Sequence, residues 1–231
     1  MKLVVFGDSF PNGLIKYPTR NSKEVREKIN FGTQLIQLEN TFTEVCNYAM
    51  SGCNNAMIFD TILQCLKQHT DNVFFLVCWT SPTRRYFYDY GVERYDNIPK
   101  KFYSMTNELN ENLELAKFIG TCSSLLHYFD IPFAQTNSFY PLPIENPFTV
   151  DYYKKCNVIK AEYPITNTLF DIMAETFCTD KNVRQNYDDN HDKFNIDPNE
   201  YIAGCLHPTE LGHKKIAQVL NPVIESYLPK P

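Results

Sequence analysis

The sequence lacks several features that would assign it at once to a known class of protein. No apolar run approaches the roughly 20 residues that a membrane helix needs, so we expect no membrane-embedded segment. Lys and Arg number 22 against 27 Asp and Glu, which gives a net charge of −5. Because nucleic-acid binding requires a basic surface, we expect no nucleic-acid partner. Hydrophobic residues make up 43% of the 231 residues and charged residues only 21%, a balance that excludes extensive disorder.

Two further absences concern the cellular compartment. The eight cysteines include no C-x-x-C pair, which excludes zinc-ribbon and thioredoxin-like motifs. Each cysteine lies singly in an apolar segment, so we expect buried free thiols, which are typical of a reducing environment. The apolar run at the N-terminus extends only from Leu3 to Phe6, too short for a signal peptide, and no cleavage site follows it. The sequence therefore predicts a cytoplasmic protein.

What the chain does contain is an alternation of apolar runs and helical periodicity. The pattern predicts strands at residues 3–6, 42–46, 73–78 and 131–135, and helices at about 22–38, 55–67, 105–128 and 208–227. Strands that alternate with helices form βαβ units. We therefore expect a three-layer α/β/α fold with a parallel sheet of four to five strands.

The length favours one domain that spans residues 1–231. Residues 138–202 lack periodic apolar positions and contain several prolines, so they hold too little apolar surface for a core of their own. We interpret this segment as an insertion in the C-terminal half that folds over the sheet, with one short helical candidate at 168–177.

Unusual loops follow each predicted strand, at residues 7–13, 47–55 and 79–85 and at Asn137. In parallel sheets, ligands bind beyond the carboxyl ends of the strands. The sequence therefore gathers its candidate functional residues along one edge of the sheet.

Two residues at this edge suggest nucleophilic catalysis. Ser9 follows the first strand directly, where its hydroxyl can reach the sheet edge and backbone N–H groups are close enough to stabilise an oxyanion. A hydroxyl becomes an effective nucleophile only when a base removes its proton, and histidine is the usual base. His207 precedes Pro208 at the start of the last predicted helix, a position that can face the same edge.

Three segments carry a resemblance to a known family. Gly7–Phe10 (GDSF) resembles the first block of the GDSL, or SGNH, hydrolases, Asn47–Gly52 their second block, and His207–His213 (HPTELGH) their last block. The resemblance implies a flavodoxin-like SGNH hydrolase fold and a serine esterase that acts through an acyl-enzyme without a metal or organic cofactor. The absence of a G-x-S-x-G motif argues against an α/β-hydrolase.

The resemblance also implies roles for individual residues. Ser9 would be the nucleophile, His207 the general base and then acid, and the backbone N–H groups of Ser9 and Gly52 part of the oxyanion hole. The asparagine of the family's third block, which donates to the oxyanion, is absent. Ser81 aligns with it and can donate through its hydroxyl, with Thr80 as the next candidate.

The catalytic acid departs from the family pattern as well. The family's aspartate lies three residues before the histidine, where this chain has Gly204. Asp197 and Glu200 are candidate replacements, and a Ser–His dyad oriented by a backbone carbonyl is the alternative. Residues 188–191 form a literal D-x-x-H without the following proline, and we expect a solvated loop there rather than a catalytic or metal site.

The expected substrate is a small-molecule or carbohydrate acyl ester. Candidate substrate-binding residues near the three motifs are Asp8, Asn54, Trp79, Thr80 and Arg84. Arg84 can grip a carboxylate or phosphate together with Arg85, or the pair can simply be solvated. Trp79 can line an apolar or sugar-stacking groove, although for most of the aromatic side chains in this region the sequence favours packing under the insertion. We expect His213 to pack or to cap.

Two alternatives to hydrolysis remain open at this point. An O-acyltransferase would use the same site with a second hydroxyl as acceptor. Because the third-block asparagine and the usual acid are both missing, the fold could also serve as a non-catalytic binding module. The sequence does not distinguish these classes, and it carries no sign of the oligomeric state.

Overall fold

The described part of the chain folds around a parallel sheet of four strands. The computed structural model describes residues 1–13, 30–38, 41–68, 71–80, 108–138, 147–159, 169 and 207–229. The strands are β1 (Lys2–Phe6), β2 (Glu44–Asn47), β3 (Val73–Trp79) and β4 (Phe133–Asn137). Their order is β2-β1-β3-β4, and every pairing is parallel. All four carboxyl ends therefore lie at one edge of the sheet.

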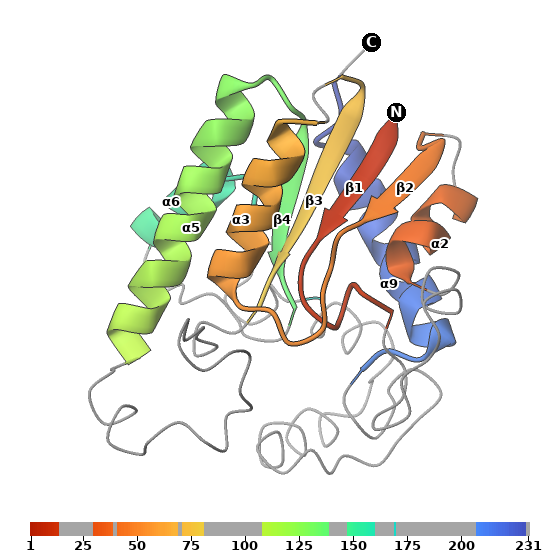
Figure 1. Cartoon of the computed structure of the whole chain (residues 1–231), viewed down its shortest axis with the longest axis horizontal. Coiled ribbons are helices and arrows are strands. Elements are labelled where there is room, and N and C mark those ends of the chain that lie inside the picture. The colour runs from red at the N-terminus through yellow and green to blue at the C-terminus, as the bar shows by residue number, and fades with distance from the viewer. Residues whose placement is uncertain are drawn as a thin grey trace.

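Helices cover both faces of the sheet (Figure 1). Helices α3 (Asn55–Leu66) and α5 (Glu108–Tyr128) pack on one face, and α2 (Phe31–Leu38) and α9 (Glu210–Glu225) on the other. A further helix, α6 (Pro147–Lys155), contacts α5 through a hydrogen bond from the Tyr152 hydroxyl to the Ala116 carbonyl, 2.7 Å long. The predicted three-layer α/β/α architecture is confirmed.

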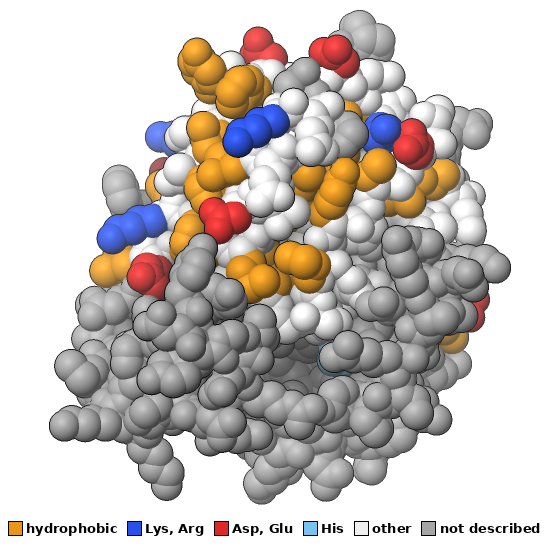
Figure 2. All heavy atoms as spheres, viewed as in Figure 1, with side chains coloured by type: hydrophobic (Ala, Val, Ile, Leu, Met, Phe, Trp, Pro, Cys, Tyr) orange, Lys and Arg blue, Asp and Glu red, His pale blue; other side chains and the backbone are white. Residues whose placement is uncertain are grey.

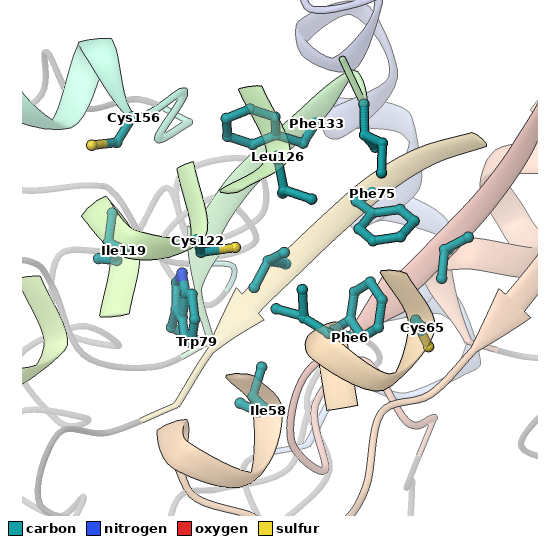
Figure 3. Packing of buried hydrophobic residues seen from close by; sticks show 14 of the residues in the cluster. Phe6, Ile58, Cys65, Phe75, Trp79, Ile119, Cys122, Leu126, Phe133 and Cys156 are labelled. Carbon is teal, nitrogen blue, oxygen red and sulfur yellow. The ribbon is translucent and has the colours of Figure 1, made fainter. Parts of the chain in front are cut away.

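The apolar run of β1 explains why both faces are covered. Leu3 and Val5 pack in the cluster formed with α2 and α9, whereas Val4 and Phe6 pack in the cluster formed with α3 and α5. All four side chains are fully buried. Figure 3 shows the second cluster, in which Phe6 and other side chains of the sheet meet residues of α3 and α5. A strand buried on both faces has to be apolar at successive positions.

The predicted elements agree with the structure except at their ends and in the insertion. Strand β2 begins two residues later than expected, and β4 begins and ends two residues later. Helix α2 is described only from Phe31, so the expected helical start near residue 22 lies outside the described residues. Helix α6 lies within the segment expected to lack regular structure. The helical candidate at 168–177 is described only at Leu169, which is buried.

Two expectations about composition can be compared with the described residues. Six of the eight cysteines are described, and all six are free thiols; five are buried, as expected, whereas Cys46 is half-buried. Among the described helices, none combines the length and the apolar character needed to cross a membrane.

Candidate active site

The loops that follow β1 and β2 are held together by hydrogen bonds. The Met50 amide donates to the Gly7 carbonyl over 2.9 Å, and the Asn47 side-chain amide donates to the Pro11 carbonyl over 2.9 Å. The Asn12 side-chain amide also donates to the carbonyl of Ala49. The first and second sequence motifs are therefore neighbours at the carboxyl edge.

Gly7 allows the first loop to pass close to the end of β3. A Cβ atom at this position would lie 2.8 Å from the Cys78 carbonyl oxygen and 2.9 Å from the Cys78 Cβ. Such distances are shorter than real Cβ contacts, so any side chain would push the loop away from β3. The glycine of the first motif thus brings the segment that carries Ser9 against the centre of the sheet edge.

His207 lies against Ser9, although 198 residues separate them. The imidazole Nε2 is 2.8 Å from the Ser9 Oγ, and the serine is only 5% exposed. The start of α9 places this histidine: Thr209 is the N-cap, and its hydroxyl accepts a hydrogen bond of 3.1 Å from the Gly212 amide. A neutral imidazole with this geometry can accept the hydroxyl proton.

His213, in the first turn of α9, has a different environment. Its side chain is fully buried and stacks on Phe31, with ring centroids 6.3 Å apart. Burial, and secondarily the neighbouring His207, lowers the pKa of His213 to about 3. Neither ring nitrogen has a hydrogen-bond partner in the part of the chain that the structure describes. His213 therefore packs as a neutral side chain, in agreement with the sequence-based expectation.

Gly52 in the second motif is exposed and has a positive φ of +82°. A Cβ atom there would meet no atom within 4 Å, so the space next to this backbone is open. Glycine adopts this conformation at little cost and leaves its backbone accessible to a ligand. The geometry is compatible with the oxyanion role expected for the Gly52 N–H, which stays a prediction.

Trp79 does not line a groove, contrary to one sequence-based expectation. Its side chain is fully buried, its indole N–H donates to Gln135 Oε1 over 2.9 Å, and its ring stacks on Phe118 with centroids 6.1 Å apart. Figure 3 shows the indole among the packed core side chains. The residue lies on the face of β3 that α5 covers, so it is unavailable to a substrate.

Three other candidate substrate-binding residues are also buried and bonded within the protein. Asn54 is the N-cap of α3, and its side-chain oxygen accepts a 2.9 Å hydrogen bond from the Met57 amide. The Thr80 hydroxyl donates to the Asp8 carboxylate over 2.6 Å. Asn54, Thr80 and Asp8 are at most 5% exposed, so they support the site from within rather than face a substrate.

The following positions lie outside the described residues, and the roles expected for them stay predictions: Ser81, Arg84, Asp197, Glu200 and residues 188–191.

Sequence reasoning missed two polar residues at this edge. Ser138 follows β4 directly, and its hydroxyl donates to the Asp8 carboxylate over 3.0 Å. The Asn55 side chain accepts from the Thr80 amide over 2.9 Å and donates to the Thr80 carbonyl over 3.2 Å. Both lie at the ends of predicted strand or loop segments, so their position was a usable signal, but neither belongs to a recognised motif.

A groove of about 530 Å³ lies beside the second motif. One face of α3 and the segment after β2 line it, through Asn47, Tyr48, Ala49, Met50, Met57, Asp60, Thr61 and Gln64. Figure 2 shows hydrophobic side chains and an acidic one gathered over α3. Among the residues that the structure describes, the lining contains a carboxylate but no Lys or Arg, so it favours a neutral ligand over an anionic one.

The architecture just described is shared with known esterases. No protein-family model and no curated protein matches the sequence. Among solved structures, TesA matches with a TM-score of 0.54 and 10% identity, over 99% of this chain and 100% of that one. A variant of Axe2, an acetyl xylan esterase from Geobacillus stearothermophilus, matches with a TM-score of 0.54 and 12% identity, over 100% of this chain and 97% of that one.

Both neighbours share the α/β fold of the SGNH hydrolases, and one of them, Axe2, is an acetyl xylan esterase. The chain therefore has the SGNH hydrolase fold, and the resemblance carried by its three motifs is confirmed at the level of the fold. Sequence identities of this size establish the architecture alone, so activity and substrate have to be argued from the site.

Proposed function

We propose that the protein is a serine esterase of the SGNH type, which hydrolyses an O-acyl ester through an acyl-enzyme at Ser9. The observation that carries the proposal is the 2.8 Å contact between Ser9 Oγ and His207 Nε2. Two residues so distant in sequence meet at the carboxyl edge of the sheet, where parallel α/β folds bind their ligands. A serine and a histidine paired in this way form the minimal unit of acyl transfer.

The reaction follows from this pair. His207 takes the Ser9 proton while Oγ attacks the ester carbonyl, and the resulting tetrahedral intermediate collapses as the imidazolium returns the proton to the departing alcohol. Water then attacks the acyl-serine, gives a proton to His207, and the carboxylic acid leaves as the proton returns to Ser9 Oγ. The net reaction converts one ester and one water into an acid and an alcohol, and it uses no cofactor.

The oxyanion is stabilised in this proposal by the N–H groups of Ser9 and Gly52 and by the Ser81 hydroxyl. A hydrogen bond of Thr80 supports the choice of Ser81 over Thr80 as the donating hydroxyl. A hydroxyl has one proton, and Thr80 directs its own toward Asp8 over 2.6 Å. Thr80 is therefore engaged elsewhere, and Ser81 is the better candidate for the third donor.

The proposed substrate is a short acyl group on a carbohydrate or another neutral polar alcohol. The groove beside the second motif supports this choice, because the described part of its lining combines apolar Met and Tyr side chains with carboxylate and amide groups and holds no cation. The structural similarity to an acetyl xylan esterase is consistent with it. Asp197 or Glu200, or a backbone carbonyl in a Ser–His dyad, completes the site in this proposal.

A serine-directed fluorophosphonate tests the central claim. We expect the wild-type protein to be labelled at Ser9, as located by mass spectrometry, and the Ser9→Ala variant to remain unlabelled. The labelled enzyme should lose its ability to hydrolyse p-nitrophenyl acetate and acetylated xylo-oligosaccharides.

The outcomes separate the three classes of function. Failure of the folded wild-type protein to react would overturn the enzyme proposal and favour a binding module. Labelling at Ser9, combined with acyl transfer to a sugar hydroxyl in preference to water, would identify an acyltransferase instead.

A further inference from the structure

Asp8, the residue that precedes the proposed nucleophile, has a fully buried carboxylate. Asp8 Oδ1 accepts hydrogen bonds from the Phe10 amide at 2.9 Å and from the Ser138 hydroxyl at 3.0 Å. Asp8 Oδ2 accepts the Thr80 hydroxyl at 2.6 Å. The side chains of Asp8, Thr80 and Ser138 are at most 1% exposed, so the network is closed to solvent.

The network joins the ends of three neighbouring strands. Asp8 belongs to the loop after β1, Thr80 follows β3 directly, and Ser138 follows β4 directly. The backbone of Thr80 is itself held by the Asn55 side chain through two hydrogen bonds of 2.9 and 3.2 Å. The Asp8 carboxylate is therefore hydrogen-bonded to residues that the ends of β3 and β4 hold in place.

This anchoring determines the conformation of Ser9. A carboxylate that accepts from the amide two residues further on forms an Asx-turn, and the residue between them is held in the turn. Ser9 is that residue, since the bond runs from the Phe10 amide to Asp8 Oδ1. The directions of the Ser9 N–H and of its Cβ–Oγ bond both depend on the turn. The 2.6 Å contact with Thr80 has the length expected of a hydroxyl donating to an ionised carboxylate, a bond about twice as strong as a neutral one.

We propose that Asp8, Thr80 and Ser138 form a positioning network for Ser9, in which the two hydroxyls fix the carboxylate and the carboxylate fixes the nucleophile's turn. This inference rests on the proposed function in so far as Ser9 is taken as the nucleophile. In this network none of the three side chains acts on the reacting atoms. Their loss should therefore lower the rate of the chemical step and leave KM nearly unchanged.

Replacement of Thr80 tests the proposal most sharply. Thr80→Val keeps the shape of the side chain and removes only the hydroxyl. We expect the second-order rate of Ser9 labelling by fluorophosphonate to fall about 10- to 100-fold, because small displacements of a reacting group have effects of this size. Thr80→Ser restores the hydroxyl and should recover labelling to within about 3-fold of the wild-type rate. Ser138→Ala should show a smaller loss than Thr80→Val, because Asp8 Oδ1 still accepts the hydrogen bond from the Phe10 amide.

Ser123 provides the matched control. It is a buried hydroxyl of α5 that hydrogen-bonds Cys156 rather than any member of the network. Ser123→Ala should lower the melting temperature to a degree comparable with Thr80→Val while Ser9 is labelled at the wild-type rate. If Ser123→Ala and Thr80→Val lost labelling equally, Thr80 would contribute only to general stability, and the proposal would be overturned.

A second measurement does not depend on activity. Hydrogen exchange of the Phe10 amide reports directly on the Asx-turn, and we expect its protection to fall at least about 10-fold in Thr80→Val but not in Thr80→Ser. If the wild-type protein reacts with no fluorophosphonate, the proposed function fails, while the exchange result still decides the positioning network. Unchanged Phe10 protection in Thr80→Val would overturn the network whatever the activity.

Discussion

The start of α9 carries two histidines in contrasting surroundings. His207 is partly exposed at the sheet edge, with its Nε2 2.8 Å from a serine hydroxyl. His213, six residues later, is fully buried against Phe31, and burial lowers its pKa to about 3. The same short segment thus supplies a side chain placed for proton transfer and another kept neutral for packing. The comparison shows that position relative to the strand ends, rather than residue type, determines what an ionisable side chain can do here.

The largest expected effect distinguishes the histidines by activity. His207→Ala should lower ester hydrolysis by about 10⁴-fold or more, as should Ser9→Ala, because the hydroxyl loses its base or is itself removed. His213→Leu should keep activity within a few-fold at neutral pH. Steady-state kinetics on p-nitrophenyl acetate measure both. His191→Ala is the control for the D-x-x-H segment, and if it were the inactive variant, the assignment of the last motif to His207 would be wrong.

A second prediction concerns the edge around His207. Ser81→Ala should lower kcat by about 10- to 10³-fold, or about 1.4–4 kcal/mol, because a proposed oxyanion donor is lost. KM should change little, since the hydrogen bond strengthens mainly in the transition state. Ser81→Asn should retain or raise activity. A Ser81→Ala variant with wild-type kcat would leave the oxyanion hole with two donors.

The third prediction concerns stability and uses the low pKa of His213. The unfolded chain binds a proton on this side chain below pH 6.5, whereas the folded protein resists protonation until about pH 3, so stability is full above pH 6.5 and falls as the pH drops. Between pH 7.5 and pH 5 this group alone should lower the free energy of unfolding by about 2 kcal/mol. Urea unfolding of wild type and His213→Leu at both pH values measures the difference.

The free energy of unfolding should fall more in the wild type than in the His213→Leu variant as the pH drops. His213→Leu should lose less stability than the wild type at pH 5, because leucine has no proton to exchange. At pH 7.5 the variant should be equally or more stable, since the buried imidazole nitrogens lack partners among the described residues. An identical pH dependence in both proteins would contradict the burial of a neutral His213.

The smallest expected effect involves a residue that supports both histidines. Thr209 caps α9 between them, and Thr209→Ala should lower the free energy of unfolding by about 1 kcal/mol. Because the cap also determines where the chain turns from His207 into the helix, we expect a modest decrease in kcat alongside it. Thr209→Ser keeps the capping hydroxyl and should restore both quantities. Thermal unfolding and steady-state kinetics on the same preparations separate the two effects.

Much of the fold could be predicted from the sequence because its elements are strongly patterned. The apolar runs at β1 and β3 and the loops after them indicated a parallel sheet and the edge that bears Ser9 and His207. Strand and helix ends moved by one to three residues, since hydrogen bonds rather than hydrophobicity determine where an element stops. Helix α6 was missed because its short sequence, rich in polar and aromatic residues, has no clear apolar stripe.

The misplacement of Trp79 had a physical reason that the sequence also contained. Phe75, Val77 and Trp79 share one face of β3, and the first two point into the cluster beneath α3 and α5. Strict alternation along a strand places the tryptophan there as well. Its position beside the third-block residues suggested that it lines a groove. Trp79 is instead the last residue of β3, and the alternation of side chains along the strand still holds there.

Polar residues at the edge were harder to assign. Asn54 and Asp8 occur in loops where substrates bind, and only the structure shows that a helix cap and a buried network use them. Sequence patterns cannot distinguish a polar group that meets substrate from one that satisfies backbone amides, because both require the same residue types at the same edge. The candidate acids, Asp197 and Glu200, lie outside the described residues, so the choice between them and a Ser–His dyad stays a prediction.

The contact between Ser9 and His207 spans 198 residues, and it has a consequence during synthesis. A ribosome delivers Ser9 198 residues ahead of its proposed base, which arrives only with the segment that leads into α9. Until that segment has docked, the serine is a hydroxyl without a proton acceptor, and the sheet face that α9 covers is bare. Nascent chains should therefore be inert toward fluorophosphonates and bound by chaperones that recognise apolar surface. Reactivity would appear only once the segment that carries His207 has docked, in a single late step.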